Sequence, residues 1–401
     1  MVAPIWTEFP KERRPGYTSI VLKLSRSCNT EELIQDVLAL DPRLLVFLQN
    51  LKRVNITIKE MAKFDQKTYL DRQNALNDTT SNCQIVTLHH QMTPLSYRTF
   101  RIPVRGLPPE PSRPDHTDSE ILLAFPIKDY GSPKIESQSV YAFLPIRDYG
   151  FKFLLQADFV LIASREDIDS SSPWNNNLLG LIPKVFHGAV KEFNKGSFRY
   201  SWLPYLPTRP SVADFFQSLE QEIVRILSNS PILESFAGVL TPPRELIYVP
   251  ERLSDENRVP LVLTPTTSSI YVSSKYSSND LYRLQQLGVT SLSTEKYIID
   301  LDNFISEYPD DFKNKPQHWH SRLAEVLMMS IARSKNYQDV VSALHIVPLR
   351  DGRWVASKDE NLLFPSRSKP LIIPNGIDVV EIHRCCIAKQ DIRCTTCLPL
   401  L

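Results

Sequence analysis

Residues 84–163 carry the hydrophobic pattern of β-strands. Their apolar positions form alternating or short continuous runs of strand length, separated by clusters of Pro, Gly, Asp and Ser. The runs are IVTLHHQM, SYRTFRIPV, SEILLAFPI, SVYAFLPI and FKFLLQADFVLIA. This segment predicts a sheet, with a mobile loop at residues 106–118, where several prolines gather.

The pattern changes to a helical period between about residues 173 and 235. Pro173 is expected to open the helix WNNNLLGLIPKVFHGAVKEF, and Ser211 with Asp214 to open VADFFQSLEQEIVRIL. In the second run the apolar residues repeat at helical spacing: Val212, Phe215, Phe216, Leu219, Ile223, Ile226 and Leu227. We expect these helices to lie on the sheet.

The regions on either side mix both patterns. Residues 17–24 alternate like a half-buried strand, Thr30 is expected to cap the helix EELIQDVLAL, and Asp41-Pro42 to restart it ahead of RLLVFLQNL. Residues 61–82 are polar and predict an exposed connection. After residue 240 short strands such as LIYVP alternate with helices such as HSRLAEVLMMSIARS, and the pattern ends near residue 376. The whole chain predicts an α+β fold.

The charge balance argues against nucleic acid and membranes as partners. Lys+Arg 46 and Asp+Glu 45 leave a net charge of +1, so the chain has no general attraction for anionic surfaces. The longest apolar runs, Leu44–Leu48 and Phe159–Ala163, are too short to span a bilayer. The N-terminus lacks the apolar core of a signal peptide, and six cysteines form no disulfide framework. We therefore expect an intracellular location, cytoplasmic or nuclear.

Phosphate-binding loops of the familiar kinds are missing. The chain has only 11 glycines against 31 prolines, and it contains neither G-x-x-x-x-G-K-[ST] nor G-x-G-x-x-G. It also lacks the H-E-x-x-H helix of zinc hydrolases. An enzyme built on one of these motifs is excluded.

Four segments carry a resemblance to a known family. They are RPGYTSIVLKL with DPRLLVFLQNLKRVNI, then VYAFLPIRDYGFKFLLQADFVLIASRED with Trp174-Asn175, then LYRLQQLGVTSLS with QHWHSRLAEVL, and finally IVPLRDGRWV. Together they resemble the sacsin-like branch of the GHKL ATPases, the superfamily of histidine kinases and the ninety-kilodalton heat-shock chaperone. The second segment is the most specific because it is long and distinctive in its order. AFPIKDYG at 124–131 and AFLPIRDYG at 142–150 also echo each other, by local duplication or by chance.

The resemblance implies four regions. Residues 1–60 would be the last strand and exit helix of a GHKL nucleotide domain, and residues 61–240 a sheet-rich middle domain with helices. Residues 241–375 would be a mixed segment similar to a sacsin repeat, and residues 376–401 an irregular Cys-rich tail. In the family, a Glu/Asn helix, an Asp-x-Gly-x-Gly turn and a glycine-rich lid hold ATP and Mg²⁺. None of these is found here, so we expect no cofactor to bind this chain alone.

Arg165 is the candidate catalytic residue. Ser164-Arg165-Glu166 is similar to a middle-domain motif of the family, whose arginine reaches the γ-phosphate of ATP, where a guanidinium stabilises developing charge. In the alternative interpretation, Ser164 caps a helix, Asp167 completes the capping box, and Arg165 pairs with a neighbouring carboxylate. Both interpretations stay open at this point.

Other candidates are weaker. Thr18 is similar to the family's strand threonine beside the adenine, and it is the candidate cofactor-binding residue, although an ordinary strand threonine explains it as well. Trp174-Asn175 is expected to be a packing anchor with a side-chain cap. Residues 148–150 are expected to form a turn, with Gly150 at positive φ.

Metal sites are not expected. His318 and His320 share a helix entry without a carboxylate at ligand spacing, and His89 and His90 would point to opposite faces of a strand. The tail has a zinc-like pattern with a short loop between ligand pairs, but an unpatterned tail explains it better: His383, Cys385, Cys386, Cys394 and Cys397.

These expectations favour a non-catalytic fragment of an ATP-dependent chaperone-type protein that binds protein clients or co-chaperones. Two alternatives remain. The chain could donate Arg165 in trans to a nucleotide held by a second chain, or it could be the inert product of a truncated gene. The last would leave an unpaired sheet edge at residues 17–24.

Overall fold

The computed structural model describes residues 24–48, 51–59, 65–74, 83–90, 93–128, 131–207, 215–333, 336–359, 362–363 and 380–382. Contacts divide the chain into two compact units. The first comprises Met1–Gln73 with Leu88–Pro94, and the second comprises Asn74–Thr87 with Leu95–Leu401. Residues 17–23 of the strand predicted at 17–24 lie outside the described residues, as do Ser211 and Asp214.

The first unit begins with two short helices, α1 (Thr30–Leu38) and α2 (Leu44–Phe47). The expected cap is displaced by one residue, because the side chain of Asn29 accepts a hydrogen bond from Glu32 N, and Thr30 is already helical. The second helix is much shorter than its apolar run predicts. It ends at Phe47, and Leu48 is extended.

A hairpin in the first unit corrects two predictions. β1 (Arg53–Lys59) and β2 (Asp65–Asn74) pair antiparallel, with Ile56 opposite Thr68. The exit helix therefore does not continue through residue 59, and the expected connection at 61–82 contains a strand. Val54, Ile56 and Ile58 alternate at period two, a strand signal that the adjoining helical run concealed. The polar β2 has no such signal, so its pairing with β1 defines it as a strand.

The second unit holds a mixed sheet. Its strands lie in the order β3, β4, β5, β8, β6, β7. β5 is antiparallel to β4 and β8, whereas β6 is parallel to β8. The bounds are β3 Cys83–His90, β4 Thr93–Val104, β5 Ser119–Ile127, β6 Ser139–Ala142, β7 Leu144–Asp148 and β8 Leu154–Ala157.

Two predicted strands are divided or shortened. SVYAFLPI forms the tight hairpin β6–β7, because Phe143 takes a left-handed conformation (φ 62°) between the strands. FKFLLQADFVLIA forms only the short β8, and Leu161 beyond it pairs with Ile168 in a separate hairpin. The loop expected at 106–118 is present between β4 and β5, with Leu107 and Glu110 buried.

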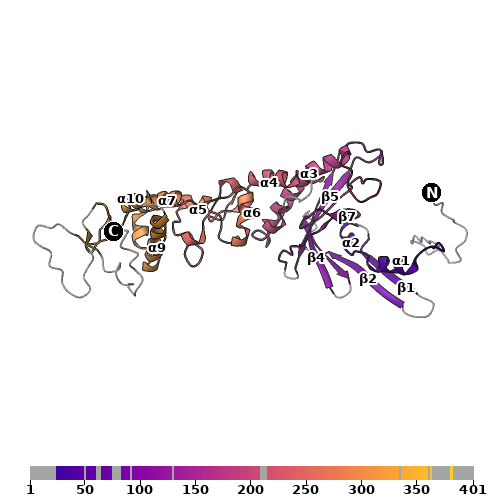
Figure 1. Ribbon diagram of the computed structural model, residues 1–401, viewed down its shortest axis with the longest axis horizontal. Helices are drawn as coiled ribbons and strands as arrows, with labels where there is room; N and C mark the ends of the chain where they lie inside the picture. The colour runs from indigo at the N-terminus through magenta and orange to yellow at the C-terminus, as the bar shows by residue number, and fades with distance from the viewer. Residues whose placement is uncertain are drawn as a thin grey trace, which may run out of the picture. The chain divides into compact units, whose positions relative to one another are not determined.

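The main core forms between the sheet and α3 (Pro173–Phe193), which lies beside β5 (Figure 1). Phe125 on β5 contacts the rings of Phe186 and Phe193 on α3, with centroids 5.9 and 4.9 Å apart. Pro173 occupies the first turn, as the pattern predicts, and Ser172 caps the helix. Fully buried aromatic side chains on both elements therefore hold the helix to the sheet.

The same core extends to residue 289, whereas Leu253, Leu261, Val262 and Tyr271 pack with the helices that follow them. The short elements of this region are η1 Leu203–Tyr205, α4 Leu219–Ser228, β9 Leu233–Glu234, β10 Leu240–Thr241, η2 Pro243–Glu245, β11 Ile247–Tyr248, η3 Glu251–Leu253, α5 Pro265–Ile270, η4 Ser278–Asp280, α6 Leu281–Gln286 and β12 Thr290–Ser291. β11 and β12 pair in parallel. The segment LVLTP, expected as a strand, instead leads into α5, because Thr264 and Thr267 form a reciprocal capping box there.

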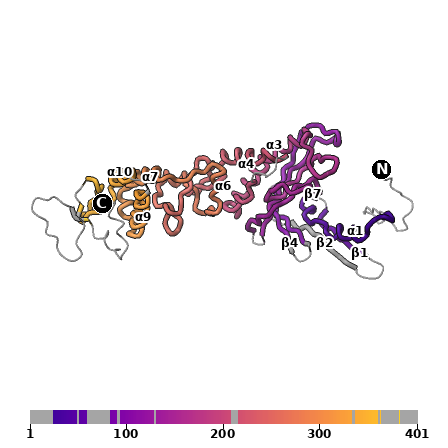
Figure 2. Tube along the Cα trace, viewed as in Figure 1, coloured from indigo at the N-terminus to yellow at the C-terminus, as the bar shows by residue number. Residues whose placement is uncertain are grey.

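A second core lies among helices that follow (Figure 2). Their bounds are α7 Thr294–Glu307, α8 Pro309–Lys313, α9 Gln317–Arg333 and α10 Asn336–Ser342. Phe304, Phe312 and Trp319 pack edge to face at its centre. The last elements are β13 His345–Pro348 with β14 Trp354–Ala356, and β15 Leu362–Leu363 with β16 Val380–Glu381.

These elements confirm the α+β class, because a mixed sheet and separate helical segments share the chain. The main core joins residues on both sides of position 240, where one predicted region ends and the next begins. Among the helices of the described residues, none has the length and apolar character needed to cross a membrane.

Candidate functional site

Arg165 lies at the tip of a small hairpin made by residues 160–169. Ile162 N donates to Asp167 O at 3.0 Å, and Asp169 N donates to Val160 O at 3.0 Å. Arg165 N closes the turn by donating to Ile162 O at 2.9 Å. Arg165 therefore lies within a turn, and the apolar run at 159–163 before it forms no regular strand.

Arg165 is exposed and adopts φ 62°. A left-handed conformation costs a residue with a Cβ about 1–2 kcal/mol. The alternative interpretation required a helix, but none begins here, and Ser164 Oγ accepts from Glu166 N (3.4 Å) within the turn. No carboxylate among the described residues forms an ion pair with the Arg165 side chain. The guanidinium therefore points its donors to solvent.

Asp167 connects this hairpin to the end of β7. Its Oδ2 lies 3.1 Å from Arg147 Nη2, and its Oδ1 accepts from the hydroxyl of Tyr149 and from Ile168 N (2.8 Å). The Arg147 guanidinium also lies over the Tyr149 ring, 4.5 Å from its centroid. One carboxylate thus binds two side chains of the Arg-Asp-Tyr-Gly segment.

Burial and the bond to Asp167 both raise the pKa of the Tyr149 phenol above its usual range. The hydroxyl therefore stays protonated and remains a donor at neutral pH. Next to it, Asp148 Oδ1 accepts from Gly150 N at 2.7 Å, and Gly150 has φ 89°. The turn expected at residues 148–150 is present, with glycine at the left-handed position.

The base of the hairpin is held by Asn175, which is fully buried. Its Oδ1 accepts from Val160 N (2.9 Å), and its Nδ2 donates to Val160 O and to Asp169 O (2.8 Å each). One amide therefore bonds to both arms. Trp174 beside it is also fully buried and donates from Nε1 to Asp158 O at 2.9 Å. The anchor expected at Trp174-Asn175 is present, although Ser172 provides the helix cap.

The sequence did not assign Arg147, Tyr149 and Asp167 to one cluster. It placed Tyr149 in a turn and Asp167 in a capping box, and it gave Arg147 no role. The sequence offered one signal for this cluster, the order of residues in the long motif. Arg147 and Tyr149 come before Asp167 and are separated from it by about one strand and one turn. Such pairing depends on how the chain reverses between them, which one sequence does not specify.

Other predicted site residues are not brought to this hairpin. Thr18 and the tail residues His383–Cys397 lie outside the described residues. His318 is exposed, whereas His320 packs among the rings of Phe312, Trp319 and Trp354. In the described part of the chain, no group of three or more His, Cys, Asp or Glu side chains is arranged to hold a metal.

Comparison with known proteins gives a limited result. No protein-family model matches the chain, and no solved structure matches it. This chain is 35% identical to Protein NO VEIN of Arabidopsis thaliana over an alignment 150 residues long. The alignment covers 34% of this chain. The match covers 6% of that protein, so the chain is similar to a small part of a much longer relative.

Proposed function

We propose that this chain is a non-catalytic, partner-binding part of a sacsin-like chaperone-type ATPase, and that Arg165 contacts the phosphate of a nucleotide held by another chain. The observation that carries the proposal is the Arg165 hairpin. Its guanidinium is exposed and makes no ion pair with the described residues, yet the hairpin beneath it is bonded on both arms by buried Asn175.

The physical argument is preorganisation. A guanidinium stabilises charge on a transferring phosphoryl group best when it is already positioned, because no free energy is then spent on ordering it. The bonds from Asn175 to Val160 and Asp169 order the hairpin in advance. The left-handed conformation of Arg165 is a further sign, since strained backbone persists where the surrounding structure enforces it.

Partner binding is supported by the exposed tip of the β6–β7 hairpin. Phe143 and Leu144 are 49% and 60% exposed, and Phe143 is also left-handed. Phe143 N donates to the side-chain oxygen of buried Gln156 at 2.8 Å, so the tip is held in place while its apolar side chains face solvent. A protein client or co-chaperone would cover such side chains.

The first test is a titration of the purified chain with ATP and Mg²⁺ by calorimetry. The proposal expects no saturation up to about 1 mM nucleotide, a concentration at which even weak specific binding of about 4 kcal/mol would be visible. Tight binding to the chain alone would contradict it.

The second test is the addition of the chain to a full-length sacsin-like ATPase with measurable hydrolysis. The proposal expects a faster rate, lost in Arg165→Ala and kept in Arg105→Ala, which removes another exposed arginine. In established cases an arginine that contacts the transferred phosphate raises the rate of hydrolysis by about a thousandfold or more. An increase in rate of at least about tenfold is therefore a modest requirement. Equal rates with both variants would contradict the role of Arg165.

A further inference from the structure

The loop between β4 and β5, residues 106–118, is organised around one turn. Arg113 N donates to Glu110 O at 2.8 Å, and Pro111 takes the second position of this four-residue turn, where proline is favoured. The side chain of Glu110 supports the same turn, because its Oε1 accepts from Ser112 N and Oγ at 3.4 and 3.2 Å. The turn is therefore fixed by bonds of its own.

Glu110 connects this turn to the start of α3. Its side chain is buried, and its Oε2 accepts from the hydroxyl of Ser172 at 3.0 Å. Ser172 is the cap of α3, and its Oγ accepts in turn from Asn175 N at 3.4 Å. A carboxylate is favoured at this place because the N-terminus of a helix carries partial positive charge. One hydroxyl thus links Glu110 to the residue whose amide bonds both arms of the Arg165 hairpin.

Arg113 connects the same turn to the chain before the hairpin. Its Nη1 donates to Asp158 O at 2.8 Å, and Trp174 Nε1 donates to the same oxygen at 2.9 Å. The guanidinium also lies over the Trp174 ring, 5.7 Å from its centroid. Asp158 comes two residues before Val160, where the backbone bonds of the hairpin begin. Both donors to Asp158 O therefore fix the chain where it enters the hairpin.

The two ends of one turn thus contact the two ends of one segment. Arg113 bonds to Asp158, Glu110 bonds to Ser172, and Arg165 lies between these two points in the chain. A segment that is fixed at both ends has lost conformational freedom before it meets a ligand. Its exposed side chain can then be aligned with a reacting group at a lower entropic cost.

We propose that Glu110 and Arg113 are positioning residues for Arg165, which align its guanidinium with a phosphate by fixing residues 158–172. This inference rests on the function proposed above, in which Arg165 contacts a nucleotide held by another chain. It adds that the β4–β5 loop controls that contact, because a change at Glu110 reaches the hairpin through Ser172.

The first measurement is hydrogen exchange at the Val160 and Ile162 amides of the full chain alone. Glu110→Ala removes the acceptor of the Ser172 hydroxyl, so the protection of both amides should fall about tenfold, the effect of one hydrogen bond to a charged group. Glu110→Gln keeps an acceptor oxygen and should keep protection within about threefold of the wild type. The Val272 amide, bonded elsewhere in the main core, should not change in either variant.

Arg113→Ala tests the other end of the segment. Asp158 O keeps its bond from Trp174 Nε1, so the protection of the hairpin amides should fall less, by about threefold. Asp115→Ala removes an exposed carboxylate of the same loop and should leave these amides unchanged, as the matched control. Unchanged protection in both Glu110→Ala and Arg113→Ala would overturn the proposal.

The second measurement is the stimulation of hydrolysis by a full-length sacsin-like ATPase over a range of concentrations of this chain. A positioning role predicts that Glu110→Ala lowers the maximal stimulated rate at least about threefold, while the concentration that gives half of that rate stays the same. Glu110→Gln should restore most of the rate. A change in the half-maximal concentration alone would overturn the proposal, because Glu110 would then act on partner binding.

The controls distinguish this inference from the function on which it rests. Equal stimulation by the wild type and Arg165→Ala would contradict the proposed function, and the exchange measurement would still decide whether the loop fixes the hairpin. Full stimulation by Glu110→Ala, with Arg165→Ala inactive, would contradict only the positioning role.

Discussion

Arg165 and Arg258 occupy the same unusual backbone conformation, φ 62°, at the ends of two short hairpins, but their surroundings differ. The Arg165 hairpin is bonded at its base by Asn175 and to the end of β7 through Asp167, and its guanidinium extends into solvent. The Arg258 loop is bonded internally by Asp255, and its guanidinium turns back to the Tyr276 carbonyl. Among the described residues, the Arg165 hairpin is therefore held through its neighbours, whereas the Arg258 side chain itself takes part in a hydrogen bond.

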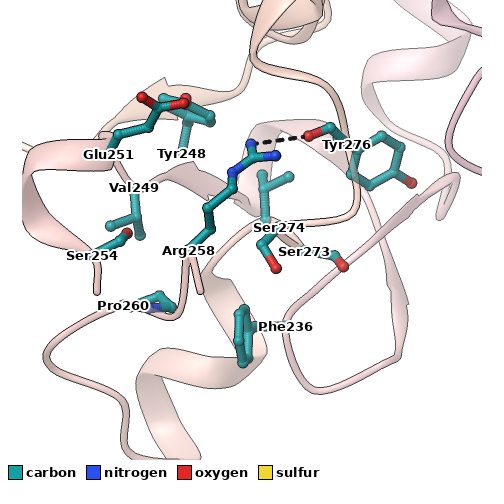
Figure 3. Close-up of a pocket in the computed structure, with 11 residues that line it drawn as sticks. Phe236, Tyr248, Val249, Glu251, Ser254, Arg258, Pro260, Ser273, Ser274 and Tyr276 are labelled. Carbon is teal, nitrogen blue, oxygen red and sulfur yellow. Dashed lines mark hydrogen bonds between the residues drawn. The ribbon is translucent and has the colours of Figure 1, made fainter. Parts of the chain in front are cut away.

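The difference between the two loops shows how a left-handed arginine can be interpreted. Strain alone does not identify a site, because it can be offset by bonds within the loop. What differs is whether the side chain itself is bonded. Both arginines are exposed, but only the Arg258 side chain donates to the described part of the chain, at the Tyr276 carbonyl (Figure 3). The two loops can therefore be distinguished by their supports and by their backbone strain.

Removing Asn175 should have the largest effect, and only on the first loop. Asn175→Ala removes three hydrogen bonds to the backbone of Val160 and Asp169 and leaves Val160 N without its acceptor, which should cost about 3 kcal/mol in total. Hydrogen exchange at the Val160 amide would report the local opening without assuming that the whole chain unfolds in one step. Asn176→Ala removes a single bond from an exposed side chain to Ser170 O and is the control. Unchanged Val160 protection would show that the base is held by other contacts.

Tyr149→Phe tests the second support of the same hairpin. Loss of the bond to the Asp167 carboxylate should cost about 1.5 kcal/mol near neutral pH. Because the folded state raises the pKa of this phenol, it keeps a proton that the unfolded chain releases above about pH 10. The stabilisation is complete below that pH and declines above it. Thermal melts between pH 8 and 11, in steps of about half a unit, should therefore show a steeper alkaline decline for the wild type than for the variant.

Glycine substitutions distinguish left-handed backbone strain at the two arginines from the hydrogen bonds of their side chains. Arg165→Gly should raise the melting temperature by removing left-handed strain of about 1 kcal/mol, since the side chain bonds to no described residue. Arg258→Gly should gain less because it also loses the bond to Tyr276 O. Arg105→Gly, at an exposed arginine outside the positive-φ positions, should show no gain. A larger gain at Arg258 than at Arg165 would reverse the comparison.

Much of the second unit was predictable from its pattern. The run Ser119–Ile127 forms β5 with the expected bounds, and Pro173 opens α3, because both elements bury continuous or periodic apolar faces in one core. The hairpin at Phe143 was not predictable, since a left-handed phenylalanine within an apolar run has no local signal. The polar strand β2 was missed for the opposite reason, because its pairing with β1, and not its own pattern, makes it a strand.

The sequence indicated individual residues of the candidate site but not how they contact one another. The motif indicated Arg165 and an anchor at Trp174-Asn175, both of which belong to local sequence. The bonds from Tyr149 and Arg147 to Asp167 join segments on either side of β8, so they required the fold. The left-handed Arg258 had no local signal either, because its loop position favours glycine.

The most direct test of the central claim combines stability with stimulation of hydrolysis in one variant. Arg165→Gly should be at least as stable as the wild type, yet it should fail to accelerate ATP hydrolysis by a full-length sacsin-like ATPase. Those two results together would show that the guanidinium is needed for the stimulation of hydrolysis and not for the stability of the fold. Full acceleration by a stable Arg165→Gly chain would contradict the account, because the phosphate would then need nothing from this side chain.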